Sequence, residues 1–157
     1  KDKNHCVICS GGGPGIMEAA NKGAKNAGGN SIGLNIQIPY EQTPNQYQTE
    51  EMKFVFHYFF MRKFWFSYLA KAIVVFPGGF GTLDELFEIY TLIKTDKSHN
   101  KIPVVLFGKE YWNSILDFGE MMKWRTIPEK FKDIIDIRDD VDDVFEFLKK
   151  NVKFSEE

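Results

Sequence analysis

One stretch constrains this chain more than any other: Pro77-Gly78-Gly79-Phe80-Gly81-Thr82-Leu83-Asp84-Glu85. It follows the short apolar run 72–76, which is typical of a buried strand, and leads into residues 83–94, which have helical character. Three glycines between a strand and a helix leave backbone N–H groups exposed, and the helix dipole adds positive potential there. The sequence therefore predicts a phosphate-binding turn at this point.

A second glycine-rich turn, at residues 10–15, lies between a predicted strand over 6–9 and a predicted helix over 16–27. It lacks the full G-x-G-x-x-G pattern of dinucleotide-binding turns, and no acidic residue ends the next strand. One glycine turn can be only a tight connection. Two such turns at the carboxyl ends of parallel strands favour a ligand site, because ligands of open α/β sheets bind there.

Strands and helices alternate along the whole chain. Apolar runs predict strands over 6–9, 31–36, 54–58, 72–76, 102–107 and 134–137. Helical patterns lie between and after them, over 16–27, 59–71, 83–94, 111–122 and 141–152. This order predicts an α/β, Rossmann-like parallel sheet with helices on both faces, in a single nucleotide-binding domain over residues 1–157. The loop 37–49 is long enough to suggest a functional role.

The composition excludes several classes of protein. A formal net charge of -2 argues against sequence-independent nucleic-acid binding, and no apolar run or secretory pattern predicts a membrane partner. Cys6 and Cys9 point to opposite faces of a predicted strand, so we expect buried, reduced core residues and a cytoplasmic protein. His5, His57 and His99 show no metal-ligand spacing, and we expect neither a metal nor another cofactor.

Glu85 and Arg62 each allow two interpretations. Thr82 and Glu85 form a T-x-x-E capping box, which would make Glu85 structural; alternatively, its carboxylate lies within reach of the sugar of a nucleotide. Arg62 and Lys63, early in a predicted helix, are either two solvated charges or face the same crevice, with Arg62 pairing with a phosphate or with Glu85. Spacing alone leaves both questions open.

The stretch 77–85 matches the P-G-G-x-G-T-x-x-E signature of the LONELY GUY (LOG) family, the cytokinin riboside 5′-monophosphate phosphoribohydrolases and their bacterial relatives. Met61-Arg62-Lys63 resembles the family's R-K element. The segments 10–21, 33–36 and 41–45 resemble its bacterial branch. Many relatives are labelled lysine decarboxylases, but that chemistry needs a lysine bound to a pyridoxal cofactor, and the sequence singles out no such lysine.

The resemblance implies hydrolysis of the N-glycosidic bond of a nucleoside 5′-monophosphate, AMP or an N6-modified AMP, without a cofactor. It implies that Arg62 and Glu85 are catalytic. The expected substrate-binding residues from both turns and the R-K element are Gly11, Gly12, Gly13, Lys63, Gly78, Gly79, Phe80, Gly81, Thr82, Leu83 and Asp84. A homodimer or larger homo-oligomer is expected, with the aromatic stretch 54–68 contributing surface. The alternative is a non-catalytic nucleotide sensor or carrier of the same fold.

Two features depart from the family pattern. Its domain normally begins with a strand and a helix before the first glycine turn, and the printed chain reaches that turn within ten residues. We therefore expect the family's first strand and helix to lie outside the given chain. The segment 41–45 does not match the acidic substrate-binding residue of the plant enzymes, which leaves the base preference open.

Overall fold

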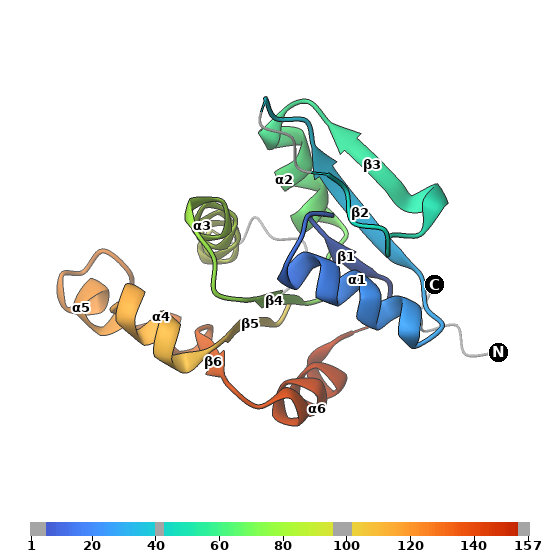
Figure 1. Cartoon of the computed structure of the whole chain (residues 1–157). Coiled ribbons are helices and arrows are strands. Elements are labelled where there is room, and N and C mark those ends of the chain that lie inside the picture. Colours follow the sequence, from blue (N-terminus) through green and yellow to red (C-terminus); the bar gives the residue numbers. More distant parts are fainter. Residues whose placement is uncertain (1–5, 40–42, 96–101, 154–157) are drawn as a thin grey trace. The chain divides into compact units, whose positions relative to one another are not determined.

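The computed structural model describes residues 6–39, 43–95 and 102–153. The chain forms two compact units, within residues 1–69 and 70–157, and each contains a three-stranded parallel sheet with helices around it (Figure 1). This architecture confirms the predicted α/β, Rossmann-like fold class. The assignment of one domain to residues 1–157 remains a prediction.

The first unit contains the first glycine turn. Its elements are β1 (Ile8–Ser10), α1 (Ile16–Asn26), β2 (Ser31–Ile36), a 3₁₀ turn (Glu50–Met52), β3 (Lys53–Phe56) and α2 (Phe59–Tyr68). The strands pair in the order β1-β2-β3, so the sheet follows chain order. Ser10, the last residue of β1, pairs with Gly33 in the middle of β2.

The second unit contains the stretch 77–85. Its elements are β4 (Ile73–Val75), α3 (Phe80–Lys94), β5 (Val104–Phe107), α4 (Lys109–Ile115), α5 (Phe118–Lys123), a 3₁₀ turn (Glu129–Asp133), β6 (Asp136–Arg138) and α6 (Val141–Asn151). The strands pair in the order β4-β5-β6. The prediction of one helix over 111–122 is wrong, because the backbone is extended at Leu116 and Asp117 caps a new helix by accepting from the N–H of Glu120.

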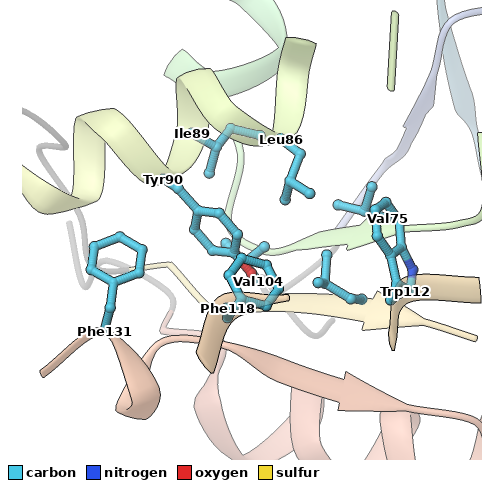
Figure 2. Close-up of a cluster of buried hydrophobic side chains, with 9 residues drawn as sticks. Val75, Leu86, Ile89, Tyr90, Val104, Trp112, Phe118 and Phe131 are labelled. Carbon is cyan, nitrogen blue, oxygen red and sulfur yellow. The ribbon is translucent and has the colours of Figure 1, made fainter. Parts of the chain in front are cut away.

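The interior of the second unit is an apolar cluster (Figure 2). Trp112 is fully buried, and its indole N–H donates to the carbonyl of Phe107 at 3.0 Å. The ring of Tyr90 lies edge-on to the rings of Phe118 and Phe131. Within the described residues the buried hydroxyl of Tyr90 has no hydrogen-bond partner. Residues of β4, β5 and α3 thus share one apolar core with residues of α4, α5 and the second 3₁₀ turn.

The interior of the first unit is largely polar. Its buried polar side chains, each at most 7% exposed, are Ser10, Asn21, Ser31, Asn35, Asn45 and Gln48. The prediction that Cys6 and Cys9 are buried is wrong, since both are free and exposed. The physical reason is that, among the described strands, β1 pairs only with β2, which leaves it at the edge of its sheet, and that it buries only its last residue.

Candidate functional site

The turn between β4 and α3 leaves a helix N-terminus open. Helix α3 begins at Phe80, three residues earlier than the predicted start at Leu83, with Gly79 at its N-cap and no side chain capping it in the described chain. The N–H groups of its first turn therefore have no acceptor within the helix. Apart from each glycine itself, its two chain neighbours and the nearby helix backbone, no described atom lies within 4 Å of where a Cβ on Gly79 or Gly81 would be. These two glycines leave room in front of the helix.

The capping-box interpretation of Thr82 and Glu85 is wrong, because Thr82 lies inside α3 and Gly79 is its N-cap. The side chain of Thr82 instead packs against Gly78, where an added Cβ would come within 2.2 Å of the Thr82 Oγ1. The carbonyl of Gly78 accepts a hydrogen bond of 2.5 Å from the hydroxyl of Tyr111. Thr82 and Tyr111 thus hold Gly78 at the start of the glycine turn. Glu85 lies in the second turn of helix α3 and is half-buried.

The other expected residues of the second turn differ in exposure. Phe80 is 92% exposed, and Asp84 is exposed as well. The side chain of Leu83 packs against the apolar cluster of the second unit, so only its backbone can serve a ligand at the turn.

The turn between β1 and α1 is formed by the buried residues Gly11, Gly12 and Gly13. Gly12 has a φ of 74°, which favours glycine. A Cβ at this position would come within 2.0 Å of the Asn35 Oδ1 and 2.9 Å of the Gln48 Nε2. Glycine is therefore required at position 12 by both conformation and packing.

Arg62 lies beside this first turn. It is half-buried on α2, and its Nη2 would be 3.9 Å from a Cβ added to Gly11. Its guanidinium carbon lies 5.8 and 5.6 Å from the ring centroids of Phe59 and Phe66. The interpretation of Arg62 as a solvated surface charge is therefore wrong. Lys63, the next residue, is also half-buried.

Sequence reasoning missed four buried amide side chains around the first turn: Asn21, Asn35, Asn45 and Gln48. Asn21, Asn35 and Asn45 entered only as parts of a resemblance. The available signal was an amide within the short apolar strand 31–36 and a second within the helix 16–27, at positions where a buried polar group needs partners.

The described residues contain no cluster of three or more His, Cys, Asp or Glu side chains arranged to hold a metal ion. No helix within the described ranges is both long and apolar enough to cross a membrane.

Comparison with known proteins places the chain in a family. The family model described as "Possible lysine decarboxylase" matches residues 17–148. The cytokinin riboside 5′-monophosphate phosphoribohydrolase of Arabidopsis thaliana is 33% identical over 74% of this chain and 54% of its own length. The chain belongs to the LONELY GUY family.

Two further relatives of the LONELY GUY family bear the same name. A probable cytokinin riboside 5′-monophosphate phosphoribohydrolase of Oryza sativa subsp. japonica is 32% identical over 82% of this chain and 49% of its own length. The cytokinin riboside 5′-monophosphate phosphoribohydrolase of Rhodococcoides fascians is 29% identical over 73% of this chain and 57% of its own length. The chain spans about half the length of these relatives. In this chain the signature of the LONELY GUY family, residues 77–85, contains the open N-terminus of α3.

Proposed function

We propose that the protein is a nucleoside 5′-monophosphate phosphoribohydrolase. In this reaction water cleaves the N-glycosidic bond: its oxygen bonds to C1′ of the ribose, and the leaving base takes up a proton. The products are the free base and ribose 5-phosphate. The names of the relatives from Arabidopsis thaliana and Rhodococcoides fascians support this reaction, and AMP or an N6-modified AMP is the proposed substrate.

The observation that carries the proposal is the open start of α3. Its first N–H groups have no acceptor within the helix, and Gly79 and Gly81 leave space in front of them. A doubly charged phosphate suits such a helix end, because the N–H groups and the helix dipole both favour an anion. A substrate held by its 5′-phosphate would have its reacting C1′ in a fixed position, which lowers the entropic part of the barrier.

Glu85 and Arg62 are the proposed catalytic residues. Cleavage of an N-glycosidic bond passes through a state resembling an oxocarbenium ion, by analogy with O-glycosides. A carboxylate can stabilise that cation or orient the attacking water. Arg62 can hold the phosphate or orient Glu85, and a planar guanidinium suits an anion better than an ammonium group does. Because Gly79 is the N-cap of α3 and Phe80 its first residue, helix capping gives no competing explanation of Glu85.

The experiment incubates the full-length protein with AMP, GMP, CMP and an N6-prenylated AMP, and measures free base and ribose 5-phosphate. We expect turnover by the wild type and a fall of about a hundredfold or more in Glu85→Ala and Arg62→Ala. Glu110→Ala is the matched control, because Glu110 is an exposed acidic residue in the first turn of α4, which also follows a strand and a glycine. Binding of AMP without release of base would overturn the hydrolase and favour the sensor or carrier.

We also propose that the protein is a cytoplasmic homodimer whose contact surface includes the aromatic stretch 54–68. Phe60, Phe64 and Tyr68 of this stretch are each at least 47% exposed. Light scattering on the purified protein tests the assembly: Phe64→Glu should shift a dimer toward the monomer. Phe145→Glu on α6, which alters an even more exposed ring, should not.

A further inference from the structure

The first glycine turn is held by amide groups from the segment 43–49. The carbonyl of Gly12 accepts three hydrogen bonds: from the Asn45 backbone N–H at 2.8 Å, from the Asn45 Nδ2 at 3.0 Å and from the Gln48 Nε2 at 2.8 Å. The Asn45 Nδ2 also donates to the carbonyl of Gly13 at 3.0 Å. Two successive carbonyls of the turn are thereby directed toward this segment.

Asn45 is in turn held by α1 and β1. The Oδ1 of Asn21 accepts from the Asn45 Nδ2 at 2.9 Å and from the Ser10 Oγ at 2.7 Å. The Ser10 Oγ itself accepts from the N–H of Gly12 at 3.1 Å. Three acceptors around one nitrogen fix which end of the Asn45 amide is the donor, so the hydrogen-bonding pattern defines a single orientation.

Gln48 is fixed by β2. The Asn35 Nδ2 donates to the Gln48 Oε1 at 3.0 Å, and the Gln48 Nε2 donates back to the Asn35 Oδ1 at 3.3 Å. Gly33 makes room for this pair, since a Cβ at that position would come within 1.7 Å of the Gln48 Oε1. Both amides are at most 6% exposed, so water does not compete for these bonds.

The consequence for the turn follows from peptide geometry. The described chain has no cis peptide bond, so the C=O of Gly12 and the N–H of Gly13 point to opposite sides of one planar unit. With the carbonyl directed toward Asn45 and Gln48, the N–H of Gly13 is directed away from them. No described residue accepts a hydrogen bond from this N–H, and the Arg62 guanidinium lies beside the neighbouring Gly11.

We propose that Asn45 and Gln48 are positioning residues that aim the N–H of Gly13 at an oxygen of the substrate's phosphate. They act through the backbone, because each holds the carbonyl on the other side of the same peptide unit. Neutral amides suit this role, since their hydrogen bonding does not change with pH. The inference rests on the proposed function and assigns to the segment 43–49 a role in binding the phosphate half of the substrate.

The experiment follows the Gly13 amide resonance of ¹⁵N-labelled full-length protein during titration with ribose 5-phosphate. In the wild type we expect this resonance to move downfield and saturate. In Asn45→Ala and Gln48→Met we expect a smaller displacement and a Kd for ribose 5-phosphate about tenfold higher, which corresponds to one lost charge-assisted hydrogen bond. In the hydrolysis assay the same variants should raise KM and leave kcat within about twofold.

Ser31→Ala is the matched control. The Ser31 Oγ is also buried and donates to the carbonyl of Tyr47 in the same segment, but it does not contact the glycine turn. Where Asn45→Ala does not fold, Asn45→Ser retains a hydroxyl donor and should give an intermediate Kd. A Gly13 resonance that ribose 5-phosphate does not move would overturn the inference, as would equal losses of affinity in Ser31→Ala and Gln48→Met. A wild type that moves this resonance yet releases no base would overturn the hydrolase and leave the inference intact.

Discussion

The two units build the same strand–glycine–helix turn on opposite kinds of interior. The six buried polar residues among those that the structure describes all belong to the first unit, whereas the large apolar cluster, with Trp112, Leu86 and Leu106, belongs to the second. In the first unit, amides from a distant segment hold the turn. In the second, the turn is held by the contact of Thr82 with Gly78 and the bond from Tyr111.

The difference shows what each kind of interior does. Burial of apolar surface stabilises a unit without specifying direction, because the hydrophobic effect is non-directional. A fully satisfied network of buried amides specifies the orientation of each group it contains, since every unsatisfied partner would cost free energy. In the first unit, therefore, the polar interior orients the glycine turn at residues 10–15. In the second unit, the turn at residues 77–85 lies at the edge of the apolar core.

The largest predicted effect is in the apolar interior. Trp112→Ala should lower the free energy of unfolding by about 3–5 kcal/mol, because it removes a fully buried ring from the centre of the cluster. Denaturant unfolding measures this loss. Trp124→Ala is the control, since Trp124 is 77% exposed and its removal should change stability by less than about 0.5 kcal/mol. Equal effects of the two substitutions would contradict the assignment of the core.

The next effect concerns the first turn. Gly12→Ala should lower the free energy of unfolding by about 2–3 kcal/mol, because alanine is strained at a φ of 74° and its Cβ would overlap the Asn35 amide. Gly23→Ala lies on α1, where no described atom other than the nearby helix backbone and chain neighbours is within 4 Å of the added Cβ. It should instead stabilise the protein by about 0.5–1 kcal/mol. Thermal unfolding of both variants compares them directly. A Gly12→Ala variant as stable as the wild type would show that the amides do not hold the turn tightly.

A third prediction tests whether the polar interior can be replaced by an apolar one. Asn21→Leu should destabilise by about 1–3 kcal/mol, because the Ser10 hydroxyl, the Asn45 amide and the carbonyl of Ile32 all lose a partner. Asn26→Leu, at an exposed position on the same helix, should be close to neutral. Urea unfolding separates the two. If Asn21→Leu stabilised the protein, it would contradict the conclusion that the first unit depends on its buried polar network.

The smallest predicted effect is a gain in stability. Tyr90→Phe should stabilise by about 1 kcal/mol, because it removes a buried hydroxyl that has no partner in the described chain. Burial raises the pKa of Tyr90 above its ordinary value, and the negative charge of Asp136 adds to the rise. The unfolded state therefore loses this proton first, and wild-type stability should fall as pH rises above about 10. Denaturant titrations at pH 8 and 10.5 should show a smaller fall in Tyr90→Phe. An equal fall in both proteins would contradict this.

Much of the fold could be predicted from sequence, because hydrophobic periodicity and glycine punctuation are local signals. The strand over 31–36 was predicted with its observed bounds, and α1 to within a residue. The start of α3 was not, because Gly79 and Phe80 carry no side-chain capping signal. The break at Leu116 was also missed, since apolar residues continue across it.

The candidate site divides in the same way. Both glycine turns were found from local pattern. The amide network was not, because bonds such as that from Gln48 to Gly12 join residues 36 positions apart, and a lone glutamine in a loop is ordinarily solvated. The location of Arg62 beside Gly11 likewise depends on how α2 packs, which spacing alone does not encode.

The central proposal is that this chain belongs to a hydrolase that cleaves nucleoside monophosphates with Glu85. The most direct measurement mixes excess full-length protein with AMP in a single turnover and quantifies adenine and ribose 5-phosphate over time. We predict equal amounts of both products from the wild type and from Glu110→Ala, and none on the same timescale from Glu85→Ala. AMP that stays intact with the wild type, or is cleaved equally fast by Glu85→Ala, would contradict the account.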